Sequence, residues 1–198
     1  MKYYKTPAQE QSVTKATNAE LINWVYNRKM TALKLHNYFR EVLCWLGLES
    51  LAKMQKCRFM SEYEDLIHIS SHMRNTTGMM PNVEGPKDVL DVDTFKLGGK
   101  AQLEQLSKAD KEKILRRIIV DWSDWEHETV DMLGDLATVF RSRAEIPTAL
   151  FLEELLEDTF EEAQTAKDIN TMLQGMNYNL ETVFAIQNKV GSGNTKED

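Results

Sequence analysis

Glycine and proline are unevenly distributed along this chain, and their distribution limits most strongly what it can fold into. Of the 9 glycines and 4 prolines in the 198 residues, six lie from Gly78 to Gly99. Because these residues break helices, the long stretches on either side, which hold few of them, favour long α-helices. The cluster itself predicts one long connection near the middle of the chain.

Apolar residues recur every three or four positions in the long stretches, which is the spacing of an amphipathic helix. The first link between predicted helices is short, the middle link is long and the third is short. Short links produce antiparallel hairpins, so the pattern predicts an all-α four-helix bundle with a long crossover between two hairpins. A further amphipathic stretch predicts a short C-terminal helix. The predicted helices span about residues 18–45, 49–74, 107–143, 147–175 and 179–190.

The predicted organisation is one bundle domain with an extension at each end. Residues 18–175 form the bundle and include a crossover over about residues 76–107, in which the alternating run 89–95 predicts a short strand. Residues 1–17 form an N-terminal arm. Residues 176–198 form the short helix and a flexible tail.

Charge and cysteine content narrow the class of protein. The 24 Lys and Arg residues against 31 Asp and Glu residues give a formal net charge of -7 at pH 7, which disfavours nucleic acid and favours a cationic or metal partner. No apolar run is long enough for a membrane helix, and the polar start lacks a signal-peptide core, so we expect a cytoplasmic protein without membrane contact. Cys44 and Cys57 follow no zinc or disulfide pattern, which favours free thiols.

Acidic residues interrupt the inward apolar stripes of three predicted helices. Glu126 and Glu162 each interrupt the stripe of one helix, and Glu62 and Asp65 lie three residues apart on another. Lone carboxylates in a core are costly or become protonated, so acids converging from three helices commonly share a cation. Carboxylates with one or two imidazoles suit iron and manganese, and two bridged metals can pass electrons to dioxygen or peroxide. The alternative is that each acid lies at its stripe edge and faces solvent.

Histidines and surface acids add further candidates. His68 and His72 lie one turn apart after an aspartate, a row that either binds metal or forms a solvated polar face. His36 could reach the bundle interior, as a ligand or as a hydrogen-bonded structural residue. Asp158 and Glu161 belong to an acidic run that is either a solvated face or an iron-holding patch.

One segment resembles the ferritin-like superfamily. The corner and helix start EIPTALFLEELLEDTFEE, residues 145–162, is similar to the bacterial ferritin pattern of Pro-Thr, Phe-Leu and a glutamate-rich turn. The distance from Glu62 to Gly78 and Pro81 also resembles the ferritin distance from a bridging glutamate to the end of its helix. The resemblance covers about residues 18–175 and implies a ferritin-like four-helix bundle.

The resemblance also implies an iron site. Glu62 occupies the place of the bridging ligand, Glu126 that of the helix C ferroxidase glutamate, and Glu162 that of a helix D glutamate. Asp158 and Glu161 fall where bacterial ferritins hold an accessory iron. The implied cofactor is a di-iron centre, with manganese as a second choice of metal. Glu62 would bridge the two ions, and Glu126 and Glu162 would hold the second one.

Three positions depart from the ferritin pattern, one of them His36, which stands where ferritins often carry a tyrosine. Lys29 stands where ferritins carry a glutamate, and Asp65 stands where they carry a histidine. Asp65, with His36 or His68, would complete the first iron position. The segment KLHNYFREV, residues 34–42, is instead similar to the helix A signature of the Dps mini-ferritins, although a phenylalanine replaces their ligand histidine.

The leading functional expectation is an iron-binding, ferroxidase-type protein that oxidises Fe(II) and stores the ferric product. The resemblance implies that identical chains assemble into a closed shell of about 12 or 24 copies. The alternative is a non-catalytic structural or interaction module, in which Lys29 neutralises Glu62 and Glu126. A third interpretation is a monomeric or dimeric dimetal oxidase that acts on an organic substrate.

Overall fold

The computed structural model describes residues 1–83 and 99–191, with side chains up to residue 187. These ranges hold seven helices and no strand. The strand predicted over residues 89–95 lies outside the described residues. The helices are α1 (Pro7–Lys15), α2 (Asn18–Trp45), α3 (Glu49–Thr77), α4 (Lys100–Gln105), α5 (Lys108–Ser142), α6 (Ile146–Gly175) and α7 (Leu180–Gly191).

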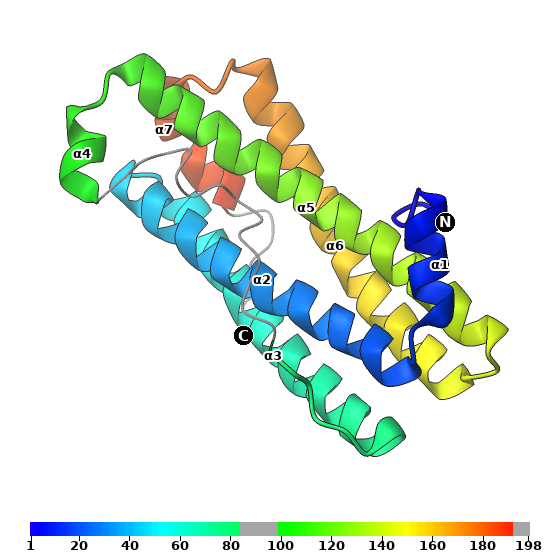
Figure 1. Cartoon of the computed structure of the whole chain (residues 1–198). Helices are drawn as coiled ribbons and strands as arrows, with labels where there is room; N and C mark the ends of the chain where they lie inside the picture. Colours follow the sequence, from blue (N-terminus) through cyan, green and yellow to red (C-terminus); the bar gives the residue numbers. More distant parts are fainter. Residues whose placement is uncertain (84–98, 192–198) are drawn as a thin grey trace.

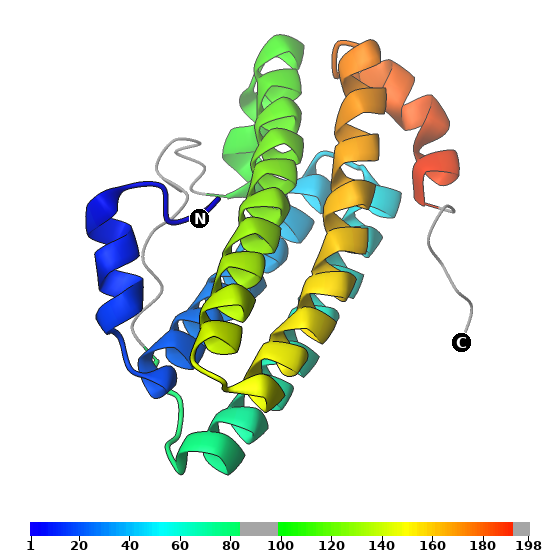
Figure 2. The same cartoon turned by 90° about the vertical axis from the view of Figure 1, so that its right-hand side faces the viewer.

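Four long helices form the body of the molecule. Helices α2 and α3 make one antiparallel hairpin, and α5 and α6 make the other. The two hairpins pack against each other (Figures 1 and 2). The short helix α7 packs beside the turn between α2 and α3. The all-α bundle of two hairpins predicted from the apolar spacing is confirmed, and each of its four helices begins and ends within three residues of the predicted position.

Local sequence signals determine where the helices start and stop. Thr17 caps α2 through a reciprocal pair with Glu20, and Ser107 accepts a hydrogen bond from the first turn of α5. The tight turn after α2 needs glycine, because Gly47 has a φ of 76° and a Cβ there would lie 2.7 Å from the Phe184 ring. Gly78 ends α3 in the left-handed conformation, with a φ of 70°.

Two apolar clusters occupy the two ends of the bundle. One cluster centres on Phe39, Leu115 and Trp122, and the other on Leu21, Leu133 and Phe140. Polar side chains from all four helices fill the layer between them. The core is therefore divided along the bundle axis into apolar, polar and apolar sections, and the polar section is the natural place to look for chemistry.

Two short helices were not predicted. Helix α1 lies within the predicted arm, and of its nine residues only Val13 is buried, so it carries too little apolar periodicity to be recognised from sequence. It is fixed to the bundle by Arg143, which donates hydrogen bonds to the carbonyl oxygens of Val13 and Thr14. Helix α4 lies within the predicted crossover and buries only Leu103.

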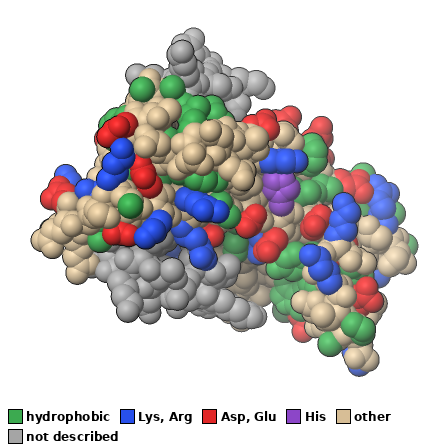
Figure 3. Space-filling view, turned by 90° about the horizontal axis from the view of Figure 1, so that it is seen from above, with side chains coloured by type: hydrophobic (Ala, Val, Ile, Leu, Met, Phe, Trp, Pro, Cys, Tyr) green, Lys and Arg blue, Asp and Glu red, His purple; other side chains and the backbone are tan. Residues whose placement is uncertain are grey.

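The surface of the molecule is charged and mixed. Seen from above, acidic and basic side chains are interspersed with hydrophobic ones over the visible face (Figure 3). Within the described residues, none of the helices combines the length and the apolar character needed to cross a membrane.

Candidate metal site

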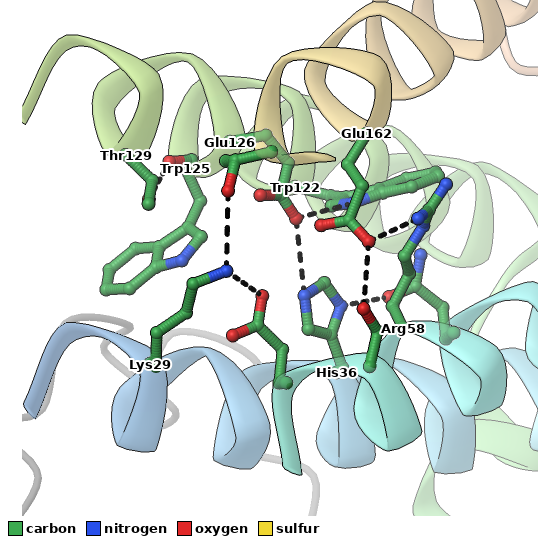
Figure 4. Close-up of polar contacts among 12 residues, drawn as sticks. Lys29, His36, Arg58, Trp122, Trp125, Glu126, Thr129 and Glu162 are labelled. Atoms are coloured by element: carbon green, nitrogen blue, oxygen red, sulfur yellow. Dashed lines mark hydrogen bonds and ion pairs between the residues drawn. The ribbon is translucent and has the colours of Figure 1, made fainter. Parts of the chain in front are cut away.

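The polar layer between the two apolar clusters gathers charged groups from all four bundle helices. Lys29 and His36 extend from α2 toward Glu126 on α5 and Glu162 on α6 (Figure 4). Helix periodicity places them together, because each lies on the inward stripe of its helix at the same level. The buried polar side chains of this layer are Lys29, His36, Gln55, Glu62, Glu126, Thr129, Thr159 and Glu162.

Lys29 is held by two carboxylates of α3. Its Nζ lies 3.1 Å from Glu62 Oε1 and 2.8 Å from Asp65 Oδ2, and 3.5 Å from the hydroxyl of Thr159. The side chain is only 1% exposed. Burial by itself lowers the pKa of Lys29, but Glu62 and Asp65 outweigh it and raise the pKa above its usual range. Lys29 is therefore a fixed buried cation.

His36 is oriented from both sides of its ring. Nδ1 lies 2.8 Å from Gln55 Oε1, and since a carbonyl oxygen only accepts, Nδ1 donates. The other nitrogen, Nε2, lies 3.3 Å from Glu126 Oε1. Burial lowers the pKa of His36, but Glu126 outweighs it and raises the pKa. Gln55 thus fixes the ring so that Nε2 faces the carboxylates of the layer.

Two buried carboxylate oxygens of this layer, Glu62 Oε2 and Glu126 Oε2, have no hydrogen-bond partner, and His36 Nε2 faces Glu126 Oε1 at 3.3 Å. His36, Glu62 and Glu126 also offer one ligand atom each, all within 4.8 Å of one another. In the described part of the chain no other group of His, Cys, Asp or Glu side chains meets this condition. Unpartnered buried polar atoms are costly, so these three side chains form the candidate metal site of the bundle.

Three neighbouring contacts position Glu126 and Glu162. Trp122 donates a hydrogen bond from Nε1 to Glu126 Oε1 at 3.1 Å. Glu162 instead pairs with Arg58 and accepts a hydrogen bond from Ser61 at 3.3 Å. Trp122 thereby holds Glu126 toward the site, whereas Glu162 is bound by Arg58 and Ser61 of α3.

Burial and charge act in opposite directions on the two glutamates of the site. Burial raises the pKa of Glu62 to about 7, although Lys29 opposes the shift. Burial also raises the pKa of Glu126, but contact with His36 outweighs it and holds the pKa below its usual value. A carboxylate with a pKa near neutrality is common at functional sites, although structural ion pairs produce such shifts too.

The architecture around this layer matches known structures. An open-pore ferritin from the hyperthermophilic archaeon Archaeoglobus fulgidus superposes with a TM-score of 0.61 over 89% of this chain and 96% of its own, at 13% identity. A humanized archaeal ferritin superposes with a TM-score of 0.62 over 92% of this chain and 100% of its own, at 11% identity. This chain has a ferritin-like fold. The resemblance inferred from residues 145–162 is confirmed at the level of fold.

A closed form of the Archaeoglobus fulgidus ferritin, made by site-directed mutagenesis, also matches the ferritin-like bundle. Its TM-score is 0.57 over 91% of this chain and 99% of its own, at 14% identity. No protein-family model matches the sequence, and no curated protein matches it. At such low identity the likeness establishes the ferritin-like fold alone.

The ferritin-like bundle brings some of the predicted ligands together and leaves others apart. His36, Glu62 and Glu126 converge. Asp65 instead forms an ion pair with Lys29, and Glu162 forms one with Arg58. The remaining predicted ligands lie on exposed helix faces, and their role in iron binding stays a prediction; they are His68, Asp158 and Glu161.

Sequence reasoning missed three partners of the candidate site. Gln55 and Arg58 lie on the same inward line of α3 as Glu62, so their periodicity was the available signal. Trp122 precedes Glu126 by one helical turn, which is the spacing at which side chains meet. Their contacts could not be read from sequence because they depend on which helix faces which.

Proposed function

We propose that this protein binds iron inside its ferritin-like bundle, oxidises Fe(II) and holds the ferric product. The observation that carries the proposal is the convergence of buried His36, Glu62 and Glu126, which offer one ligand atom each within 4.8 Å of one another, while Glu62 Oε2 and Glu126 Oε2 lack hydrogen-bond partners. Iron enters this proposal as substrate and cargo. The fold likeness to ferritins supports the proposal without proving it, because superfolds host many functions.

The donor set fits the proposed ion. One imidazole nitrogen and two carboxylate oxygens are ligands that Fe(II), Fe(III) and Mn(II) accept. Three protein ligands leave further coordination positions for water or an oxidant. On oxidation each Fe(II) would give one electron to dioxygen or peroxide.

The residues around the site would orient its ligands and exclude water. Gln55 holds the His36 ring through Nδ1, and Trp122 holds Glu126 through one of its oxygens. Such outer contacts typically contribute about 10- to 100-fold to metal affinity. Lys29 holds one oxygen of Glu62, so the other remains free for iron.

The same lysine supports the alternative function. Lys29 pairs with Glu62 as expected, but its second ion-pair partner is Asp65 in place of the expected Glu126, because Asp65 lies one turn after Glu62 on α3. This buried ion pair alone would suit a structural or interaction module without metal. The alternative explains why Glu62 Oε1 and Asp65 contact Lys29. It leaves the buried oxygens Glu62 Oε2 and Glu126 Oε2 without partners.

Aerobic Fe(II) titration, followed by absorbance, tests the proposed function. We expect the wild-type protein to oxidise Fe(II) much faster than buffer, and Glu126→Ala to lose at least about 100-fold of that rate, since it removes a ligand as well as its orientation. Asp124→Ala, which removes an exposed carboxylate from the same helix, is the matched control and should keep the wild-type rate. Equal rates for wild type, Glu126→Ala and buffer would leave the structural module as the function.

We further propose that identical chains associate through the outer face of the α2–α3 hairpin. Met60, Tyr63 and Ile67 lie on one side of α3 at helical spacing and are 47%, 51% and 48% exposed. On α2, which packs against α3, Met30 and Leu33 are only partly buried. Exposed apolar side chains gathered on one helix face favour an interaction site, and a second copy related by two-fold symmetry would cover them.

Particle mass, measured by light scattering after size-exclusion chromatography, tests the association. We expect wild-type protein to form a large assembly, about 12 or 24 chains for a closed shell. Tyr63→Lys should reduce the particle mass severalfold while far-UV circular dichroism stays unchanged, because Tyr63 is 51% exposed and the charge would face the partner. A wild-type monomer would refute the assembly. A full-size Tyr63→Lys particle would place its contacts elsewhere.

We propose a cytoplasmic setting for this chemistry. Cys44 and Cys57 are both free thiols in the structure. Reduced cysteines are usual in the cytosol, where thiol systems keep disulfides from forming.

A further inference from the structure

We infer that the site takes one metal ion per chain, bound by His36, Glu62 and Glu126, because the ammonium group of Lys29 permanently fills the position of a second cation. The inference rests on the proposed function and adds the number of ions and their place. It separates this chain from the di-iron centre that its sequence resemblance implied.

Lys29 has the contacts of a bound cation. Its Nζ carries three hydrogens and faces three oxygens, those of Glu62 at 3.1 Å, Asp65 at 2.8 Å and Thr159 at 3.5 Å. The side chain is almost fully buried, so its charge depends on nearby carboxylates for compensation. Withdrawing the ammonium to admit a metal would leave a buried positive charge without its carboxylate partners, and the lysine is therefore a fixed part of the site.

Glu62 divides the layer into two cation positions. Oε1 accepts from Lys29, whereas Oε2 is buried and has no partner. A carboxylate shared in this way has the arrangement of a bridging ligand, with an ammonium on one side and an open position on the other. His36 and Glu126 each offer a ligand atom within 4.8 Å of Glu62 and supply the remaining protein donors.

In its metal-bound form the layer has a charge that matches one divalent ion. Metal ligands bind deprotonated, so His36 then counts as neutral and the four carboxylates as ionised, and against two fixed cations this leaves a formal charge of minus two. Arg28, at the edge of the layer, pairs with Glu128 at 3.4 Å and does not change this balance. The groups counted are Glu62, Asp65, Glu126, Glu162, Lys29 and Arg58.

The remaining predicted ligands do not supply a second site. Asp65 is occupied by Lys29, and Glu162 is occupied by Arg58 and Ser61. Among the described residues, His36, Glu62 and Glu126 form the one group whose ligand atoms lie close enough to share an ion. Two ions per bundle would need a ligand where Lys29 stands.

Ion counting under anaerobic conditions tests the inference, because without an oxidant no mineral forms. Protein is dialysed to equilibrium against Fe(II), and bound iron per chain is measured by elemental analysis. We expect one ion for the wild type, none for His36→Gln at the same free Fe(II), and one for the control Asp124→Asn, which removes an exposed charge from α5. Lys29→Glu places a carboxylate where the lysine stands, and this variant should bind two ions per chain.

The possible results separate the inference from the function on which it rests. Two ions in the wild type would overturn the inference and keep iron binding. No ion in the wild type would overturn both. One ion retained by His36→Gln would overturn the assignment of ligands. Circular dichroism shows whether Lys29→Glu folds in the absence of metal. If it does not fold, the ion counts of the wild type and of His36→Gln still test the one-ion inference.

Discussion

Replacing Lys29 by methionine is expected to lower the free energy of unfolding by about 3–5 kcal/mol, the usual cost of removing one partner from a buried ion pair. Methionine fills a similar volume, so the loss reflects charge more than packing. Glu62 and Asp65 would face each other with no cation between them. Urea denaturation followed by circular dichroism, with the slope of the transition compared between variants, measures the change.

A matched lysine separates burial from loss of charge. Lys53 is exposed on α3, so Lys53→Met should change stability by no more than about 0.5 kcal/mol. Adding Glu62→Gln to Lys29→Met should recover part of the loss, because one of the two unpaired carboxylates becomes neutral. If Lys29→Met costs no more than Lys53→Met, the lysine is not the fixed cation that the structure indicates, and the one-ion inference loses its basis.

Removing the carboxylate of Asp135 is expected to release the N-terminal arm and to cost about 2–3 kcal/mol, as for hydrogen bonds to a charged group. This carboxylate accepts three backbone N–H groups, from Lys2 at 2.9 Å, Tyr3 at 2.8 Å and Tyr4 at 3.2 Å. In Asp135→Ala those donors lose their acceptor, and the buried ring of Tyr4 loses its anchor. Limited proteolysis should then cleave the arm much faster, and urea denaturation should show the stability loss.

A neighbouring acid provides the control for Asp135. Asp131 lies one turn earlier on α5 and makes only a loose ion pair with Lys2, at 3.8 Å. Asp131→Ala should change stability by no more than about 0.5 kcal/mol and leave the cleavage rate near that of the wild type. Similar proteolysis of Asp135→Ala and the wild type would mean that Arg143 and the α1 contacts hold the arm without Asp135.

The four bundle helices could be predicted because their signals are local. A stripe of apolar residues at three- and four-residue spacing determines which face of a helix is buried, and caps such as Thr17 and Gly78 determine its ends. Helices α1 and α4 escaped prediction for the same reason. Each buries a single side chain, so neither has a periodic pattern to detect.

The inward direction of the site acids could also be predicted, but their partners could not. Glu62, Glu126 and Glu162 interrupt apolar stripes, and all three are buried in the structure. Whether each meets a cation, a histidine or another acid depends on the level at which two helices cross. That level is set by packing over the whole length of the bundle.

The amino-acid sequence by itself determined that this protein is an all-α bundle of two hairpins with acids turned toward its interior, because helical periodicity is written in neighbouring residues. Only the tertiary structure decided how those acids are shared. It placed Lys29 between Glu62 and Asp65, paired Glu162 with Arg58, and left His36, Glu62 and Glu126 facing one another. These contacts join residues up to about a hundred positions apart, and their distances follow from helix packing, which no local pattern specifies.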